Sequence, residues 1–344
     1  MIRFAIPFLC LLAALTPAHG FLWFGNNPID ASPAEQTAEA RPVYEEALEA
    51  QQAGRTGRAL RKYKRVYEKY PASDFSAQAL YNSGVIHFER KNWKKAFNAF
   101  QSILIFHPDF PQFNELIRFQ FRIALAQAEG DNIRFLFVIP YRALNRSVQY
   151  FEIVINNAPY SELAPLALMN VALIHQYKGQ TANAIEALDR LINNYPTSVL
   201  ADDAYLSLAE TFATLVQGPH YDQGATREAI SYFEDFLILY SNNEDIARAE
   251  EGLAEMEDVY ARSKLVIGEY YLRHRGWFQA AEIFFNEAIT IAPESDAADA
   301  ARDFIARMEA IRENRPPPST PEERKDREEE KSFIQRLLDP ILPG

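Results

Sequence analysis

The sequence predicts an all-α protein assembled from repeated helix-turn-helix units, and three observations support this. Glycine accounts for only 13 of 344 residues. Hydrophobic residues make up 48% of the chain, and no long stretch shows the period-two alternation of a strand. One pattern of small, bulky and helix-ending residues recurs about six times. Such an array buries its core between neighbouring units, so even a long chain is stable without one large globular core.

The recurring pattern predicts the second helix of each unit. The small residue lets two helices approach closely, and a bulky residue four positions later fills the gap between units. A residue twelve positions after the small one, usually proline, ends the helix. The pairs of small and terminating residues are Ala59/Pro71, Ala96/Pro108, Ser147/Pro159, Ala184/Pro196, Ala229/Ser241 and Ala281/Pro293. The intervening bulky residues are Tyr63, Phe100, Phe151, Leu188, Phe233 and Phe285.

The first helix of each unit is expected just upstream, ending at a turn. Gly54, Gly179 and Gly276 fall at this turn, where a positive φ is often needed. Gly84 takes the small position of the first helix in the second unit. Together these features resemble the tetratricopeptide repeat, which implies a superhelical solenoid of about six helix-turn-helix units. Because such a repeat has about 34 residues, longer helices or loops are expected at 130–140, 217–224 and 242–262.

The amino-terminal residues 1–20 have the layout of a secretory signal peptide. Arg3 precedes an apolar run from Phe4 to Leu15, and Ala18-His19-Gly20 supplies a small-residue cleavage site. The apolar run is shorter than the roughly 20 residues that span a bilayer, which makes a retained membrane anchor the weaker alternative. We therefore expect an exported protein.

Cys10 is the only cysteine and lies within this segment. Pro7-Phe8-Leu9 precede it where a lipidation signal would need small residues, so we expect no lipid on Cys10. A mature chain without cysteine has neither disulfides nor thiol chemistry.

Composition divides the remainder into four segments. Residues 21–42 are expected to be a flexible leader, whose Phe21-Leu22-Trp23-Phe24 either docks on the first repeat or anchors at a membrane interface or partner. Residues 43–160 hold the N-terminal repeats and 161–313 the C-terminal repeats. Residues 314–344 are a Pro-rich linker and charged tail with a short amphipathic helix, which either docks on a partner or on the solenoid, or is disordered.

No catalytic or metal-binding constellation is found in the sequence. No two of the six histidines are spaced i, i+4, and there is no phosphate-cradling glycine loop or nucleophile elbow. His87 and His175 occupy equivalent places that normally pack between helices. The formal net charge of −12 argues against nucleic acid, which requires a basic footprint. We expect a binding protein that is not an enzyme, with no cofactor, no metal and no small-molecule substrate.

The resemblance to tetratricopeptide repeats implies a peptide-binding groove. In that family the first helix of each repeat lines the concave face, and an asparagine there commonly holds the backbone of a bound peptide. The residues expected in this groove are Tyr44, Tyr81, Asn82, Val85, Phe88 and Asn170. The alternative is that these tyrosines fill the interior of the superhelix.

Cationic residues crowd the first two repeats, against the sign of the whole chain. They are Arg55, Arg58, Arg61, Lys62, Lys64, Arg65, Lys69, Arg90, Lys91, Lys94 and Lys95. Four of them share one helical face by their i+3 and i+4 spacing, namely Arg58, Arg61, Arg65 and Lys69. The run is either an ordinary solvated face or a docking surface for acidic protein or anionic lipid headgroups.

The last two repeats resemble a particular family. The residues of this chain that carry the resemblance are the run from Tyr221 to Ala229, Tyr232-Phe233, Phe236, Leu253-Ala254, Tyr260, Gly268-Glu269-Tyr270-Tyr271, Arg275-Gly276-Trp277 and Pro293. These resemble the carboxy-terminal half of the BamD family of outer-membrane assembly lipoproteins, and the likeness extends over roughly residues 43 to 312.

That resemblance implies a periplasmic scaffold, associated with the outer membrane, that helps to insert β-barrel proteins into that membrane. Its implied partners are the barrel insertase and unfolded outer-membrane proteins. The resemblance places Tyr270, Tyr271, Arg275 and Trp277 near the insertase contact. The chain departs from the family in lacking the usual lipoprotein cysteine and in having six repeats in place of five. The alternative is a periplasmic adaptor for cell-envelope or cell-wall machinery. An enzyme accessory or helical hydrolase would need a catalytic group that the sequence does not supply.

The export signal gives a first testable prediction. We expect the mature chain to begin at Phe21 and to carry no lipid, because Ala18 and Gly20 suit a signal peptidase. Intact-mass analysis of the protein purified from envelopes tests this. A mass that includes a diacylated cysteine contradicts it.

Overall fold

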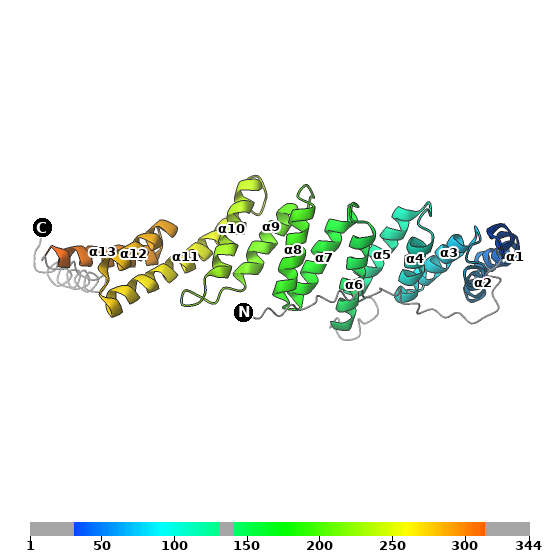
Figure 1. The fold of residues 1–344 in the computed structure, drawn as a ribbon, viewed down its shortest axis with the longest axis horizontal. Coiled ribbons are helices and arrows are strands. Elements are labelled where there is room, and N and C mark those ends of the chain that lie inside the picture. Colours follow the sequence, from blue (N-terminus) through cyan, green and yellow to red (C-terminus); the bar gives the residue numbers. More distant parts are fainter. Residues whose placement is uncertain (1–30, 131–140, 314–344) are drawn as a thin grey trace, which may run out of the picture. The chain divides into compact units, whose positions relative to one another are not determined.

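The computed structural model describes residues 31–130 and 141–313. These residues form thirteen α-helices and one π-helical turn, with no β-strand among them (Figure 1). The expected all-α fold is confirmed. The chain divides into two compact units, Met1–Phe110 and Pro111–Gly344. The sequence-based division between residues 160 and 161 differs from this one, because α6 and α7 pack against each other across that point.

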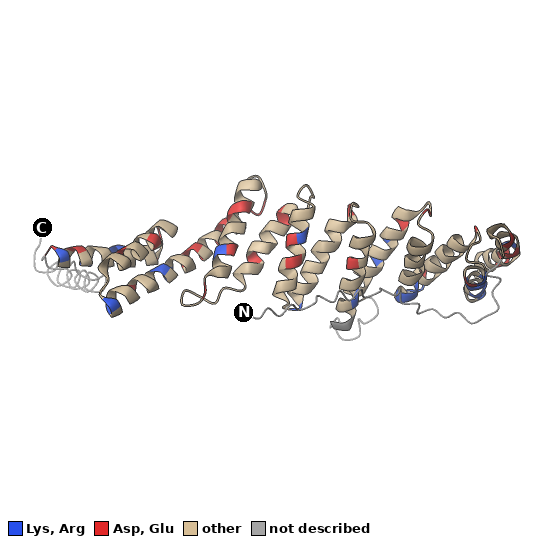
Figure 2. Ribbon diagram, viewed as in Figure 1, with Lys and Arg blue, Asp and Glu red and all other residues tan. Residues whose placement is uncertain are grey.

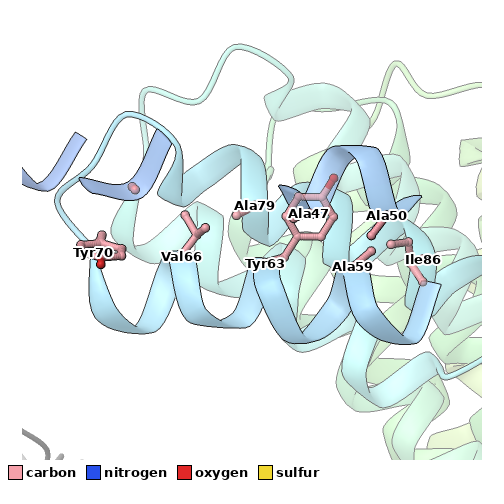
Figure 3. Packing of buried hydrophobic residues seen from close by; sticks show 9 residues of the cluster. Ala47, Ala50, Ala59, Tyr63, Val66, Tyr70, Ala79 and Ile86 are labelled. Atoms are coloured by element: carbon pink, nitrogen blue, oxygen red, sulfur yellow. The ribbon is translucent and has the colours of Figure 1, made fainter. Parts of the chain in front are cut away.

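The described part of the first unit, from residue 31 onwards, contains four helices, each packed against the next along the chain. They are α1 (Pro33–Gln52), α2 (Thr56–Lys69), α3 (Ser76–Glu89) and α4 (Trp93–Phe106). Tyr63 of α2 is fully buried at the centre of their core, beside Ala47, Ala59 and Ala79 (Figure 3). The methyl groups of these alanines leave the space that the tyrosine ring occupies.

Helix α1 corrects the expectation of a flexible leader over 21–42, since it begins at Pro33. Ser32 and Glu35 form a capping box: the Ser32 hydroxyl accepts from the Glu35 N–H at 3.3 Å, and the Glu35 carboxylate accepts from the Ser32 N–H at 2.8 Å. Proline suits the first helical position. Pro42 lies within the helix and lacks a backbone N–H, and Ala40 two residues earlier is fully buried. Residues 1–30 and 314–344, which include the expected signal peptide, Cys10 and the expected tail, lie outside the described residues.

The described part of the second unit contains nine α-helices, and each packs on its neighbour in sequence. They are α5 (Phe113–Ala128), α6 (Tyr141–Asn157), α7 (Leu163–Tyr177), α8 (Thr181–Asn194), α9 (Ala201–Ala213), α10 (Gly224–Leu239), α11 (Ile246–Tyr270), α12 (Phe278–Ile291) and α13 (Asp296–Arg312). The π-helical turn η1 (Tyr271–Arg275) joins α11 to α12.

All six expected second helices are present, as α2, α4, α6, α8, α10 and α12. Their small residues are fully buried, and every intervening bulky residue is at most 2% exposed. The turns before them also follow the expectation, because Gly54, Gly179 and Gly276 have φ of 70°, 66° and 62°. In the second repeat Lys91 takes this left-handed conformation instead, with φ of 56°.

Helix α11, with 25 residues, is shared by two helix pairs. A Cβ on Gly252 would lie 2.4 Å from the ring of Phe233 in α10, and one on Gly268 would lie 2.6 Å from the ring of Phe285 in α12. Each glycine therefore provides the surface on which a phenylalanine of a second helix rests. The expected lengthening over 242–262 takes the form of this helix.

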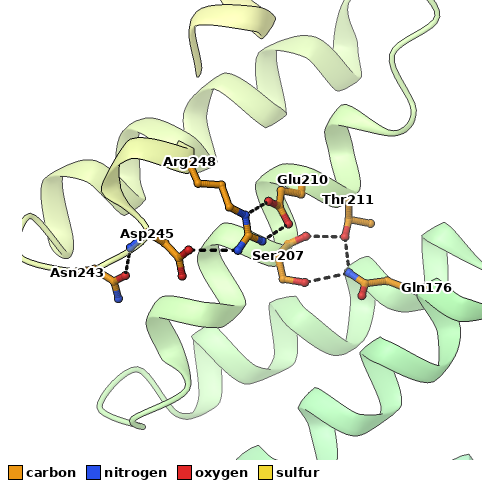
Figure 4. Close-up of polar contacts among 7 residues, drawn as sticks. All are labelled: Gln176, Ser207, Glu210, Thr211, Asn243, Asp245 and Arg248. Atoms are coloured by element: carbon orange, nitrogen blue, oxygen red, sulfur yellow. Dashed lines mark hydrogen bonds and ion pairs between the residues drawn. The ribbon is translucent and has the colours of Figure 1, made fainter. Parts of the chain in front are cut away.

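Polar bridges connect the first helices of successive repeats in the second unit (Figure 4). Gln176 of α7 donates to the Ser207 and Thr211 hydroxyls of α9 at 2.9 and 2.8 Å. Arg248 of α11 donates to both carboxylate oxygens of Glu210 in α9 at 2.6 and 2.7 Å. Such a two-point contact fixes the relative orientation of two helices more tightly than a single hydrogen bond.

The close packing on glycine gives a stability prediction. We expect Gly84→Ala and Gly268→Ala each to lower the free energy of unfolding by about 1–3 kcal/mol, because the new Cβ would lie 2.5 or 2.6 Å from a buried phenylalanine ring. Thermal unfolding followed by circular dichroism measures the change.

The matched control is Gly57→Ala, since Gly57 is also helical but has no neighbour within 4 Å of an added Cβ. We expect it to be neutral or to stabilise the chain by up to about 1 kcal/mol through helix propensity. Equal melting temperatures for all three variants and the parent would show that the packing of the phenylalanine rings does not require glycine.

Candidate binding surfaces

In the first unit Asn82 is the centre of a hydrogen-bond network within the protein. Its side-chain amide donates to the hydroxyls of Tyr44 and Tyr63, both at 3.2 Å, and its carbonyl oxygen accepts from Gln78 at 3.2 Å. The Tyr63 hydroxyl in turn donates to Gln51 at 2.6 Å. The amide is therefore occupied, and a peptide backbone would have to displace a tyrosine to reach it.

The tyrosines of this network are held neutral. Burial raises the pKa of Tyr63 to about 12, with a smaller opposing effect from the Asn82 hydrogen bond. Burial also raises the pKa of Tyr44, whose ring stacks on Phe75 at 4.9 Å. Both hydroxyls remain hydrogen-bond donors at physiological pH.

The other expected groove residues of this unit lie in separate ring contacts. Tyr81 packs against Phe110 at 5.7 Å and Phe100 at 6.4 Å between ring centroids. Phe88 meets Trp93 edge to face at 5.4 Å, and Val85 is half-buried. Among the described contacts, Tyr44 and Asn82 touch directly, and Tyr81 and Phe88 each have other partners. Their role in peptide binding stays a prediction.

In the second unit, α7 presents an exposed apolar stripe around Asn170. Leu166 precedes Asn170 by one helical turn, and Leu173 and Tyr177 follow it by one and two turns. Leu173 and Tyr177 are 51% and 67% exposed. A cavity of about 190 Å³ adjoins the stripe, lined by Asn170, Leu173, Tyr177, Ala128, Leu144 and Ile174. The Asn170 amide donates to the Leu166 carbonyl of its own helix at 2.7 Å.

Sequence reasoning found Asn170 but missed Leu173 and Tyr177. The apolar residues of α7 surround nearly the whole helix, so its exposed side cannot be distinguished from its buried side by periodicity. Offsets of one and two helical turns from Asn170 would have identified Leu173 and Tyr177.

At the C-terminal end, Tyr271 anchors a stack of three rings. Its ring lies nearly parallel to Phe284 at 5.5 Å and to Trp277 at 5.8 Å. The π-helical turn η1 places Tyr271 between them, and Gly276, with φ of 62°, reverses the chain so that the Trp277 N–H donates to the Tyr271 carbonyl at 3.2 Å. π-helical turns are often found at functional sites.

Of the four residues expected here, one packs in the core of the repeat and three are exposed. Tyr271 is half-buried and belongs to the core of the last repeat. Tyr270 and Trp277 are 48% and 58% exposed. Arg275, the last residue of η1, is also exposed. Tyr270 also contacts the His274 ring at 5.2 Å. We call Tyr270, Arg275 and Trp277 the C-terminal surface.

A second cleft, of about 650 Å³, lies between α11 and α12. Its lining includes Tyr260, Ile283 and Ile291, and an ion pair of 2.7 Å joins Lys264 to Glu287 beside it. The Lys264 ammonium also lies over the Tyr260 ring at 5.0 Å. Sequence analysis did not find this cleft, since its residues come from two helices and share no motif.

The described residues contain no group of three or more histidine, cysteine, aspartate or glutamate side chains placed to hold a metal ion. Burial, with smaller effects from Lys95 and Arg90, lowers the pKa of His87. Its Nδ1 makes no hydrogen bond to the described residues, whereas the His175 Nδ1 lies 2.8 Å from the Gln180 side-chain oxygen. None of the described helices is both long and apolar enough to cross a membrane.

Paired helices that carry buried small and bulky residues at fixed spacing define a tetratricopeptide-repeat protein. A tetratricopeptide-repeat family model matches residues 34–111, which hold α1 to α4. The YfiO family model, described as an outer membrane lipoprotein, matches residues 142–313, half of the chain. The chain belongs to this family.

Curated relatives match a shorter region. The outer membrane protein assembly factor BamD of Caulobacter vibrioides is 29% identical over 130 residues, which are 38% of this chain and 43% of that protein. The BamD of Xylella fastidiosa strain 9a5c is 25% identical over 141 residues, 38% and 48% of the two chains. The chain thus spans about half the length of these relatives. Among solved structures, a tetratricopeptide repeat protein from Parabacteroides merdae aligns with 78% of this chain across 98% of its own length. The two are 14% identical, with a TM-score of 0.31.

The contrast between the two asparagines is testable. We expect Asn82→Ala to lower the free energy of unfolding by about 1–2 kcal/mol, since it leaves Gln78 and Tyr44 without their partner. Asn170→Ala removes only a bond within its own helix, and we expect a change within about 0.5 kcal/mol. Urea unfolding compares them. A larger loss for Asn170→Ala than for Asn82→Ala would overturn this assignment.

Proposed function

We propose that this protein is a non-enzymatic scaffold of the outer-membrane β-barrel assembly machinery, in the periplasm and associated with the outer membrane. Membership of an outer membrane lipoprotein family and the relatives named as assembly factors support this. The observation that carries the proposal is the C-terminal surface, because it lies within the matched residues and combines exposed aromatic rings with an arginine.

This surface has the composition of a hot spot for protein binding. Tryptophan, tyrosine and arginine are the residues whose truncation most often costs binding free energy. The stack of Trp277 on Tyr271 and Phe284 orients the indole before any partner arrives, which reduces the entropy lost on association. The barrel insertase is the partner that we assign to it.

The α7 stripe is the second part of the proposal and would hold segments of unfolded outer-membrane proteins. Leu166, Leu173 and Tyr177 are spread over about 16 Å of helix axis. A β-strand presents an apolar side chain to one face about every 7 Å, so an extended barrel strand could place two or three along the stripe. Asn170 supplies an amide beside them.

One observation favours a different partner. The YfiO match begins at residue 142, so α1 to α5 lie outside it. A tetratricopeptide adaptor for other cell-envelope or cell-wall machinery would carry its distinctive contacts in those helices. This is the alternative function.

The test is affinity purification from envelope membranes followed by mass spectrometry, with wild type and the Arg275→Ala/Trp277→Ala double variant. Loss of a hot-spot residue costs about 2 kcal/mol or more, roughly a thirtyfold loss of affinity. We expect the variant to keep the melting temperature of the parent and to lose the insertase.

Tyr221→Ala/Arg227→Ala is the matched control, since it removes an exposed aromatic and an exposed arginine from α10 and the loop before it. It should retain the insertase. Recovery of another envelope complex by the wild type in place of a barrel protein would support the adaptor, and equal recovery by both variants would exclude the C-terminal surface.

A further inference from the structure

The outward side of α2 is cationic. Arg58, Arg61 and Arg65 lie opposite the buried side of the helix, which is formed by Ala59, Tyr63 and Val66, and all three are exposed. Lys64 is exposed beside them. Figure 2 shows Lys and Arg concentrated on α2 and at the beginning of α4. This is opposite in sign to the net charge of −12 of the whole chain.

Few of these charges are neutralised by the protein. On α2 the ion pairs among the described residues are Lys62 with Glu46, and Lys64 with Glu68 at 3.5 Å. Arg58, Arg61 and Arg65 make none of 4 Å or less there. The pKa of Glu46 is lowered, mainly by its hydrogen bond and charge interaction with Lys62 and to a smaller extent by Arg58 and Arg65. One carboxylate is thus shared by several cations, and the three guanidinium groups remain available for an external anion.

The equivalent side of α4 carries apolar groups. Ala96, Phe100 and Ile103 of α4 are buried as Ala59, Tyr63 and Val66 are in α2, so equivalent positions on the two helices face outward alike. Lys95 corresponds to Arg58, while Ile105 and Phe106 correspond to Glu68 and Lys69. Ile105 and Phe106 are 59% and 72% exposed. The outer side of this unit therefore combines arginines with protruding apolar side chains.

The ends of these helices and the start of α1 lie at the same edge of the unit. Gln36 and Thr37 in the first turns of α1 accept hydrogen bonds from the Ala72 and Asp74 N–H groups after α2, at 3.0 and 3.1 Å. Ser76 and His107, 3.3 Å apart, join the start of α3 to the end of α4. In the sequence, Phe21-Leu22-Trp23-Phe24 precede Pro33 of α1 by nine residues.

We propose that the outer side of α2 and α4 binds an anionic lipid surface. Guanidinium groups bind phosphate with paired hydrogen bonds, and each basic residue near an anionic membrane adds to binding. Ile105 and Phe106 can enter the boundary between headgroups and acyl chains. A soluble acidic protein could pair with the arginines but would offer no apolar layer to Ile105 and Phe106. We therefore assign lipid as the occupant. This binding does not depend on the insertase.

The experiment is sedimentation of the full chain with vesicles of phosphatidylglycerol and phosphatidylcholine, compared with pure phosphatidylcholine vesicles. We expect binding to the anionic vesicles that weakens as salt rises. Arg58→Gln/Arg61→Gln/Arg65→Gln should lose roughly a hundredfold in affinity, whereas Arg58→Lys/Arg61→Lys/Arg65→Lys should retain most of it. Ile105→Ser/Phe106→Ser should bind several-fold more weakly.

Arg227→Gln/Arg262→Gln/Arg302→Gln is the matched control, because it removes the same charge from exposed arginines of the second unit. It should bind like wild type. Equal binding of the wild type to both kinds of vesicle overturns the proposal. A loss of affinity in the control as large as that in Arg58→Gln/Arg61→Gln/Arg65→Gln also overturns it. So does tighter binding to soluble polyglutamate than to the anionic vesicles, which would identify an acidic protein as the partner. Unchanged insertase recovery by the Gln variant would separate this surface from the proposed scaffold function.

Discussion

The contact on which the described fold depends is the meeting of a bulky side chain with a small one between two helices. Tyr63, Phe100 and Phe285 each fill a space that exists only because an alanine or glycine lies opposite. The pair sets the distance between helices as well as burying apolar area, so an error of one methyl group changes the helix spacing. Hydrogen bonds such as Arg248 to Glu210 then fix the relative rotation of helices already placed at that distance.

This contact also explains why most of the fold could be predicted from the sequence. The spacing of Ala59, Tyr63 and Pro71 is local, and local patterns that repeat are visible without knowledge of the partners. The polar, proline-containing composition of residues 26–40 is typical of a flexible leader, and it conceals the start of α1, although the pair Ser32 and Glu35 is a recognisable capping box. The division of the chain at Phe110 depends on which helices form each compact unit, and no local sequence pattern records that.

The candidate surfaces were predicted less completely for a related reason. Tyr271 was grouped with its neighbours in sequence, yet it supports the surface from within while Tyr270 and Trp277 are exposed. Asn82 was identified by its position in the repeat, but position does not reveal that Tyr44 and Tyr63 already occupy its amide. Exposure and hydrogen-bond satisfaction depend on side chains from other helices. Sequence spacing therefore locates a surface better than it assigns roles within it.

The shared helix α11 has a mechanical consequence. An unbroken helix of 25 residues is about 37 Å long, and its two glycines support phenylalanines from the helices on either side. In most repeat arrays a unit can fray at the end while its neighbour stays folded. Here the last two repeats lack a joint at which to separate, so bending or unwinding one would withdraw the support of the other. A displacement of the C-terminal end of α11 is therefore transmitted to its contact with α10.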